Sequence, residues 1–412
     1  MKEKNVIDVL VERGYIAQST DLEGLRELFK GKGIKFYIGF DPTADSLHVG
    51  HFIQMMIMAH LQRDGHYPIA LLGGGTGMIG DPSGRSDMRK MLTPETIKHN
   101  VNRFSKQMEI LLDFSEGKGK ILDNAEWLLD LNYIEYLREV GPHFSINRML
   151  AADAYKRRLE DGLTFLEFNY MTLQAYDFFK LYEEYGCKVE LGGNDQWSNI
   201  IAGVELIRRK TGNQDAYGIT SNLLVKANGE KMGKTSSGAL WLDESKTSPF
   251  DFYQYWRNLD DADVINCMKL LTFIPLEEIA EYEKLEGHEI NEAKKRLALE
   301  VTTIVHGEEK AQAAEQQALD IFAGSGRSDD MPTTEVTLSE LEAGLPLLAT
   351  MTDAELTSSN SEARRMVQQG AVKINDEIVN DTYYNLGVED LINGEIIIRR
   401  GKKIFHRILL VD

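Results

Sequence analysis

The chain has 412 residues, 42% of them hydrophobic and 27% charged, which allows two or three domains with buried cores. No apolar run approaches the roughly 18 residues of a membrane span, and the first residues lack the apolar core of a signal peptide. The two cysteines, Cys187 and Cys267, lie far apart and outside any metal-binding spacing. They predict a reducing cytoplasmic location, without structural disulfides or a metal site.

The net charge argues against a protein that binds nucleic acid over its whole surface. The 46 basic and 65 acidic residues give a formal charge of −19, whereas counterion release favours basic surfaces. Cations are nevertheless concentrated locally, between Arg399 and Arg407 and at Arg364, Arg365 and Lys373. Selective RNA binding and a solvated surface with scattered cations explain these clusters equally well.

Strands and helices alternate in the first third of the chain. We expect strands at Lys35–Phe40, Tyr67–Leu72 and Lys120–Asp123, followed by helices at about 48–64, 94–114 and 127–139. This alternation predicts an α/β fold with a doubly wound, Rossmann-like parallel sheet. Ligands of such sheets bind beyond the carboxyl ends of the strands.

The later elements suggest a change of architecture along the chain. We expect a helix at 164–185, a strand at 188–191, a helix at 196–210 and helical turns from 248 to 320. A polar, glycine-rich stretch at 323–330 predicts a linker, and two short helices and alternating strands follow residue 345. The predicted domains are a catalytic domain at 1–240 with an insertion near 115–160, a helical region at 241–340 and a small α+β domain at 345–412.

The first candidate site follows the first strand and reads Gly39-Phe-Asp-Pro-Thr-Ala-Asp-Ser-Leu-His-Val-Gly-His51. Gly39 and Gly50 let the backbone approach a bulky nucleotide. His48 and His51 share the first turn of a helix, whose free N–H groups and dipole suit phosphate. Two histidines alone are more often surface or capping residues, and zinc would need a third ligand. The thirteen-residue string is far more specific than the pair.

A second candidate is Lys231-Met-Gly-Lys-Thr235, in which two lysines flank a glycine. A mobile segment of this kind can bring two positive charges onto a polyphosphate, where charge develops as pyrophosphate leaves. Lys-x-x-Lys by itself usually belongs to a solvated loop. Its place some 180 residues after the first string makes the pair of motifs specific.

The helix at 164–185 carries a polar stripe formed by Tyr170, Gln174 and Asp177, spaced i, i+4 and i+7. Such a stripe normally faces water. The flanking residues here are apolar nearly all round, so we expect a buried helix whose polar stripe lines an internal pocket.

Two glycine-containing strings complete the candidates. Gly192-Gly-Asn-Asp-Gln-Trp-Ser-Asn199 stands where a strand opens into a helix, and Gly80-Asp-Pro-Ser-Gly84 contains Asp81. Either could be a simple turn. Glycine also suits close approach of a ribose.

These strings, in this order, resemble those of the class I aminoacyl-tRNA synthetases and, within them, the bacterial tyrosyl branch. The first is similar to the family's His-Ile-Gly-His signature, with Val49 for isoleucine, and the second to its Lys-Met-Ser-Lys-Ser loop. The departures at Gly233 and Thr235 are typical of tyrosyl members. The resemblance implies a tyrosine–tRNA ligase, which activates L-tyrosine with ATP to tyrosyl-adenylate and pyrophosphate and then transfers tyrosine to the 3′ end of tRNA(Tyr).

The resemblance also implies a role for each motif residue. Tyr37 and Asp177 would contact the substrate phenol and so reject phenylalanine, which would leave both without a partner. Glu190 stands where we expect glutamine and receives no role. The other implied tyrosine-binding residues are Asp81, Asn124, Tyr170, Gln174 and Gln196; the ATP-binding residues are Gly39, Asp41, Gly50, Gly193, Asp195 and Lys234; the catalytic residues are His48, His51, Lys231, Lys234 and Thr43. ATP would act as a substrate with Mg²⁺, with no tightly bound cofactor.

Near the C-terminus, the segment from Ser361 to Asn375 resembles the small RNA-binding fold named after ribosomal small-subunit protein S-four. This resemblance implies that five cations contact tRNA: Arg364, Arg365, Lys373, Lys402 and Lys403. From the resemblance we also expect a homodimer, anticodon binding by the helical region at 241–340, and neither DNA nor a membrane as partner.

Three alternatives remain at this point. A tryptophan-specific relative would not place Tyr37 opposite Asp177 and would lack the RNA-binding tail. A non-catalytic RNA-binding paralogue would have lost a signature lysine or histidine, and none is lost here. A small-molecule nucleotidyltransferase with the same histidine signature would have no use for the arginine-rich tail.

Overall fold

The computed structural model describes residues 4–83, 91–235, 238–322, 332–375, 377–392, 394–401 and 404–411. The chain forms two compact units, Met1–Ala311 and Gln312–Asp412, and each is described by itself. Among the helices described, none is long and apolar enough to cross a membrane.

The first unit is built around a six-stranded sheet of order β1-β6-β5-β2-β3-β4. Five strands run parallel, and β1, on one edge, is antiparallel to β6. From β2 the chain builds the sheet to one side through β3 and β4, and then to the other side through β5 and β6. Doubly wound sheets bind ligands in the crevice at this change of direction. The expected α/β fold with a doubly wound parallel sheet is therefore confirmed. The strands are β1 (Ile16–Ser19), β2 (Lys35–Phe40), β3 (Tyr67–Leu72), β4 (Lys120–Asp123), β5 (Val189–Gly193) and β6 (Tyr217–Ser221).

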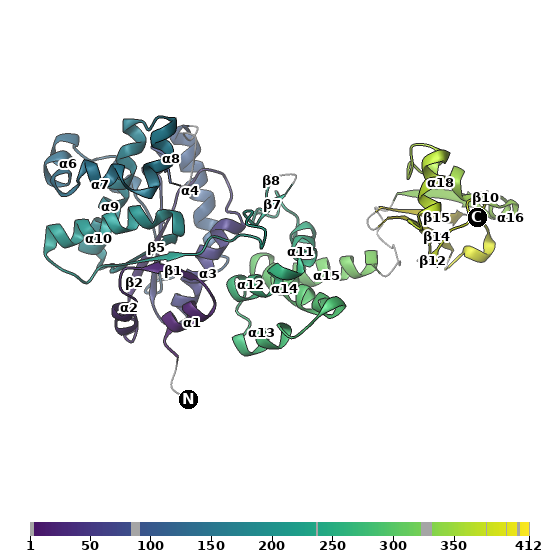
Figure 1. The fold of residues 1–412 in the computed structure, drawn as a ribbon, viewed down its shortest axis with the longest axis horizontal. Coiled ribbons are helices and arrows are strands. Elements are labelled where there is room, and N and C mark those ends of the chain that lie inside the picture. The colour runs from purple at the N-terminus through teal and green to yellow at the C-terminus, as the bar shows by residue number, and fades with distance from the viewer. Residues whose placement is uncertain are drawn as a thin grey trace. The chain divides into compact units, whose positions relative to one another are not determined.

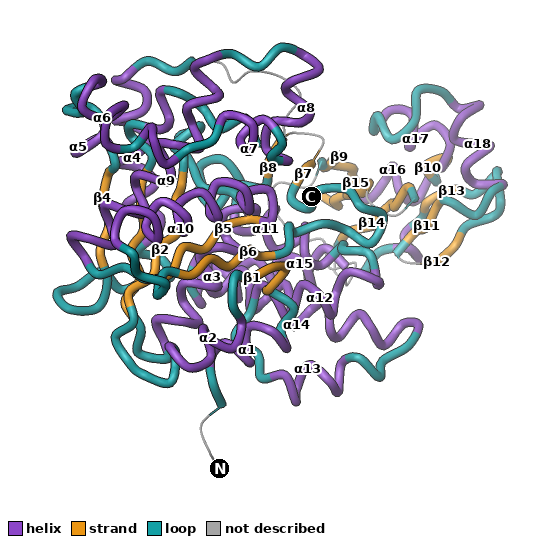
Figure 2. Tube along the Cα trace, turned by 60° about the vertical axis from the view of Figure 1, so that its left-hand side comes forward, coloured by secondary structure: helices purple, strands orange, loops and turns teal. Residues whose placement is uncertain are grey.

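Helices cover both faces of this sheet (Figures 1 and 2). On one face lies α3 (Val49–Arg63), and on the other α9 (Phe165–Tyr185) packs against α10 (Trp197–Thr211). The side chain of Thr164 caps the first turn of α9, and Gly186 ends it in the left-handed conformation at φ 66°. Because both faces are covered, the central strands are apolar almost throughout, and all but the first residue of β3 is buried.

The remaining helices of the first unit surround this core. A helical region, α11 to α14, follows the sheet, and α12 packs against α3. The bounds are α1 (Val6–Glu12), α2 (Leu22–Leu28), α4 (Pro94–Met108), α5 (Ala125–Leu128), α6 (Tyr133–Glu139), α7 (Ile146–Leu150), α8 (Asp153–Asp161), α11 (Pro249–Arg257), α12 (Asp261–Leu271), α13 (Leu276–Tyr282) and α14 (Ile290–His306), with short strands β7 (Lys234–Thr235) and β8 (Gly238–Ala239). Helix α15 (Glu308–Phe322) runs from the first unit into the second.

Several local expectations differ from the structure. The helix expected at 94–114 is α4, which ends at Met108, and strand β1 was not expected. The helix expected at 127–139 is two helices, α5 and α6, because Asn132 interrupts it. The Asn132 side chain accepts the N–H groups of Ile134 and Glu135, at 3.0 and 3.2 Å, and so begins a new helix. Strand β6 was not expected either, although four of its five residues are buried.

The second unit has its own core and a five-stranded sheet of order β12-β11-β14-β15-β9. Strand β9 pairs in parallel with β15, so residues before position 345 belong to this sheet. The elements are β9 (Thr333–Thr337), α16 (Leu338–Ala343), β10 (Leu345–Pro346), α17 (Leu347–Asp353), α18 (Asn360–Gln368), β11 (Val372–Ile374), β12 (Glu377–Ile378), β13 (Asn385–Leu386), β14 (Glu395–Arg400) and β15 (Ile404–Val411).

Candidate active site

A cavity of about 530 Å³ lies beyond the carboxyl ends of β2, β3 and β5. Its size is within the ordinary range of small-molecule sites. It brings together every residue that the sequence assigned to tyrosine, ATP or catalysis: Tyr37, Gly39, Asp41, Thr43, His48, Gly50, His51, Asp81, Asn124, Tyr170, Gln174, Asp177, Gly193, Asp195, Gln196, Lys231 and Lys234. Residues from positions 37 to 234 thus meet in one place.

The buried end of the cavity contains Tyr37 and Asp177, which are 1% and 2% exposed. The Asp177 carboxylate accepts a hydrogen bond from Trp127 Nε1 at 2.7 Å and another from Asn124 Nδ2 at 2.9 Å. Burial raises the pKa of Asp177 well above its usual value, while these two donors act in the opposite direction. Burial likewise raises the pKa of the Tyr37 hydroxyl. This end of the cavity therefore suits a ligand that is apolar except for a hydroxyl.

Trp127 and Thr76 are two residues of this end that sequence reasoning missed. Thr76 Oγ1 accepts from Asn124 Nδ2 at 3.0 Å, and the N–H of Gly75 donates to Asn124 Oδ1 at 2.8 Å. These bonds fix the orientation of the Asn124 amide, so its N–H₂ faces Asp177. The available signal was that Trp127 lies one helical turn after Asn124, and a buried indole N–H needs an acceptor.

Further carboxylates lie in the walls next to this end, or behind them. Asp81 accepts from Gln196 Nε2 at 2.6 Å, and the Tyr170 hydroxyl donates to Asp41 at 2.9 Å. Gln174 Nε2 donates to Glu190 Oε1 at 3.0 Å. A cluster of acids and amide groups of this kind provides acceptors for an ammonium group.

The opposite end carries His48 and His51, which open α3. His48 Nδ1 accepts the N–H of Gly50 at 3.0 Å, and His51 Nδ1 accepts the N–H of His48 at 3.2 Å. In a neutral imidazole the hydrogen then resides on Nε2, so each ring presents a donor there. Burial lowers the pKa of His48, and Lys231 acts in the same direction. A Cβ at Gly50 would lie 2.8 Å from the His48 ring, so a larger residue there would displace this imidazole.

Lys231 and Lys234 are exposed and line the same end of the cavity. Between them, Gly233 adopts a φ of 80°, which favours glycine, and its N–H donates to the Tyr255 hydroxyl at 2.8 Å. The chain after this loop pairs with the start of α3, because Val49 N–H donates to the Leu240 carbonyl at 3.1 Å. The two signature segments are therefore in direct contact.

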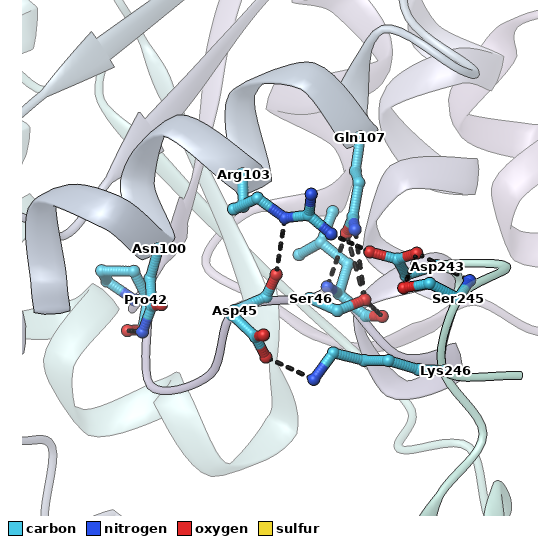
Figure 3. A network of polar contacts seen from close by, with 10 residues as sticks. Pro42, Asp45, Ser46, Asn100, Arg103, Gln107, Asp243, Ser245 and Lys246 are labelled. Carbon is cyan, nitrogen blue, oxygen red and sulfur yellow. Dashed lines mark hydrogen bonds and ion pairs between the residues drawn. The ribbon is translucent and has the colours of Figure 1, made fainter.

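A polar network extends this contact from the loop before α3 to helix α4 (Figure 3). Lys246 forms an ion pair with Asp45 at 2.6 Å and lowers its pKa. Arg103, on α4, donates to the Asp45 carbonyl at 3.3 Å and pairs with Asp243. Gln107, one turn later, accepts the N–H of Leu47. The network fixes the segment after the second signature against Asp45 and Leu47, which lie within the first signature.

The predicted RNA-binding cations lie in the second unit. Arg364 and Arg365 are exposed on α18, and Lys373 stands on β11 opposite Arg399 of β14. Lys402 and Lys403 lie outside the described residues. Two other cations of the 399–407 run form ion pairs within this unit, Arg400 with Glu362 at 3.6 Å and Arg407 with Glu395 at 3.7 Å.

The chain is similar to known proteins over most of its length. Residues 30–323 match the family model described as tRNA synthetases class I (W and Y), and residues 325–408 match the one described as Tyrosine--tRNA ligase SYY-like C-terminal domain. The tyrosine–tRNA ligase of Acetivibrio thermocellus is 58% identical over 99% of this chain and 100% of its own length. The tyrosine–tRNA ligase of Clostridium beijerinckii is 57% identical over 98% of this chain and 99% of its own length.

Solved structures show the same relationship. A C-terminally truncated mitochondrial tyrosyl-tRNA synthetase of Aspergillus nidulans is 30% identical and covers 78% of this chain and 95% of its own, with a TM-score of 0.69. A tryptophanyl-tRNA synthetase of Encephalitozoon cuniculi is 13% identical over 76% of this chain and 88% of its own, with a TM-score of 0.56. The latter likeness concerns the fold alone.

Proposed function

Because this chain belongs to the tyrosine–tRNA ligase family of the class I tRNA synthetases, we propose that the cavity of its first unit binds tyrosine and ATP together. The reaction activates tyrosine with ATP, releases pyrophosphate and transfers tyrosine to tRNA. The observation that supports this location is the lining of the cavity, which combines the buried carboxylates Asp81 and Asp177 with the exposed lysines Lys231 and Lys234.

The substrate side chain would occupy the buried end, with its phenol between Tyr37 and Asp177. Its ammonium group would lie among Asp81, Tyr170 and Gln174, where acidic and amide oxygens accept hydrogen bonds. Gln196, which is held by Asp81, would contact the carboxylate, and Asn124 would orient Asp177. In this arrangement the carboxylate points away from the acidic end and toward the cations.

ATP would occupy the other end, with its phosphates facing the cations. The substrate carboxylate attacks the α-phosphorus, a P–O bond forms, and the bond to pyrophosphate breaks. No protein nucleophile is required, because positioning and charge stabilisation suffice for this kind of transfer. Mg²⁺ would enter with ATP, bound by its phosphates. The proposed phosphate-contacting residues are Thr43, His48, His51, Lys231 and Lys234, and the nucleoside contacts are Gly39, Asp41, Gly50, Gly193 and Asp195.

The tRNA would be held by the exposed cations of the second unit, Arg364, Arg365 and Lys373. Positive charges at separate positions neutralise phosphates without making the whole surface basic. The helical region around α11 to α14 would contact the anticodon. Lys402 and Lys403 remain part of this proposal from the sequence.

A homodimer is also proposed. Large apolar side chains are exposed in the segment from α5 to the start of α9, including Leu129 at 59%, Ile134 at 62%, Ile146 at 57% and Phe165 at 69%. A gathering of this kind in one stretch of chain is typical of a protein–protein interface. Replacing Phe165 with Asp should produce monomers in sedimentation equilibrium, whereas a wild type that is already monomeric would contradict the dimer.

The central proposal is tested by pyrophosphate exchange into ATP, measured with each of the twenty amino acids. We expect exchange with tyrosine and none comparable with tryptophan or phenylalanine. Charging of tRNA measured on the same preparation completes the test. Exchange that prefers another amino acid, or no exchange at all, would overturn the assignment of the cavity.

A further inference from the structure

Glu190 is a buried carboxyl group behind the wall of the cavity, and the motifs gave it no role. It stands on β5 directly opposite Tyr37 of β2, so both side chains point to the same face of the sheet. It is 1% exposed. Two oxygen atoms on this face, Glu190 Oε2 and the Tyr37 hydroxyl, are buried, and among the residues that the structure describes neither has a hydrogen-bond partner apart from the other, which lies close enough to shift its pKa. Buried polar atoms of this kind are rare and require an explanation.

The other oxygen of Glu190 has a defined role. Oε1 accepts the N–H of Gln174 Nε2 at 3.0 Å. A protonated carboxyl group that accepts through Oε1 carries its hydrogen on Oε2, for which the described residues offer no partner apart from Tyr37. The neutral acid therefore has one donor left, and the nearby Tyr37 oxygen is an available acceptor.

We propose that Glu190, in its neutral form, is a positioning residue that sets the direction of the hydrogen bonds around the substrate phenol. It donates to the Tyr37 oxygen, the Tyr37 hydroxyl then donates to the phenol oxygen, and the phenol hydroxyl donates to Asp177. This inference rests on the proposed binding of tyrosine between Tyr37 and Asp177. Glu190 itself touches no substrate atom in this arrangement.

Ionisation of Glu190 would reverse this order. A carboxylate can only accept, so the Tyr37 hydroxyl would turn its hydrogen to Glu190 and no longer donate to the substrate. Tyrosine would then lose one hydrogen bond in a buried site. Loss of such a bond weakens binding by about three- to tenfold.

The surroundings of Glu190 set the pH at which this happens. Burial raises the pKa of Glu190 to about 7, while hydrogen bonding to Gln174 and Tyr37 acts to lower it. The titratable groups around Glu190 and Tyr37 are Asp177 on α9 and Cys187, which precedes β5. Asp177 raises the pKa of Tyr37, and Glu190 raises the pKa of Asp177. Gly203 of α10 faces Oε2 and offers no charge. Glu190 is therefore neutral below about pH 7, so tyrosine should bind tightly there and more weakly above.

The experiment is equilibrium dialysis of tyrosine against the full chain between about pH 6 and 8. The wild type should lose about three- to tenfold in affinity across it. Glu190→Gln should bind tightly at every pH, because the amide accepts from Gln174 and donates to Tyr37 as the neutral acid does.

Asp263→Asn is the matched control, because Asp263 is similarly buried on α12, does not line the cavity, and accepts the N–H of Ala227, a bond that an asparagine oxygen can keep. This variant should keep the wild-type pH profile. A wild type whose affinity for tyrosine does not change with pH would overturn the inference without any variant. So would a Glu190→Gln profile with the wild-type slope. Absence of tyrosine-dependent exchange at all pH values would instead refute the proposed function.

Discussion

At the scale of single residues, the buried end of the cavity depends on polar groups whose partners are fixed. An ionised carboxyl group in such a place is unfavourable unless donors compensate for lost water. Asp177 has two, Trp127 and Asn124, and Asn124 is itself held by Gly75 and Thr76. A site of this rigidity can discriminate by the presence of one hydroxyl.

Asp177→Asn should weaken tyrosine activation severely. The new amide cannot accept from both Trp127 and Asn124, so a buried donor loses its partner in addition to the lost contact with the phenol. We expect kcat/KM for tyrosine in exchange to fall by about 100-fold or more, with the preference over phenylalanine largely abolished. The exposed Asp113→Asn serves as control. Near wild-type exchange with tyrosine would show that the phenol lies elsewhere.

At the scale of elements, two signature segments about 180 residues apart in sequence are joined by backbone and side-chain contacts. Val49 pairs with Leu240, and Gly233 is held by Tyr255 from α11. The lysines on the second segment remain exposed. The segment is thus anchored in its middle at Gly233 and by the chain that follows it at Leu240, while its charged side chains are available to a ligand.

Lys231→Ala and Lys234→Ala should each slow adenylate formation by about 10²- to 10³-fold, the usual cost of removing a donor aimed at charge that develops in the transition state. The Kd for tyrosine should change little, because neither lysine lies at the buried end of the cavity. Stopped-flow measurement of adenylate formation separates the two quantities. A loss that falls mainly on tyrosine affinity would contradict this role.

The ion pair between Asp45 and Lys246 should contribute to the same step by holding the second segment in place. Lys246→Asp puts two like charges together and should slow adenylate formation by about fivefold, a modest effect because the pair is partly exposed. The reversed pair, Asp45→Lys with Lys246→Asp, should recover most of the rate. If the double variant is as slow as the single one, the pair does not position the segment.

At the scale of the whole molecule, the chain divides into two units with separate cores. All residues proposed for tyrosine and ATP lie in the first unit, and the proposed tRNA cations lie in the second. The two steps of the reaction therefore have different structural requirements. A truncation that separates the two units should end before β9, because β9 belongs to the sheet of the second unit.

A chain that ends at Phe322 should keep pyrophosphate exchange and lose most tRNA charging. A cut near residue 343 would leave β9 without its partner β15 and is a poorer test. The milder change, Arg364→Ala with Arg365→Ala, should reduce the slope of the logarithm of tRNA affinity against the logarithm of salt concentration by about one per lost phosphate contact. Exchange and charging are measured at two salt concentrations. Wild-type charging by the truncated chain would show that the second unit does not hold tRNA.

Much of the fold and the membership of the cavity followed from the sequence by itself. The strands β2, β3 and β4 begin and end where the apolar pattern placed them, because periodicity and turn residues are local properties. The signature strings likewise indicated which residues share the cavity, since each string stands at the end of a strand or the start of a helix. The family and its reaction were confirmed by the comparisons, whereas the individual roles in the cavity stay predictions.

Tertiary structure alone decided which side chains hold one another. The paired side chains of Arg103 and Asp243 are 140 positions apart in the sequence. Trp127 and Asp177, which share a hydrogen bond, are 50 positions apart. Nothing local in the sequence specifies such pairs. Glu190 acquires its interest only from the register of β5 against β2, which sets it opposite Tyr37 in the buried interior. Burial and the direction of a neighbouring atom determine whether a carboxyl group is charged, and both are properties of the folded chain.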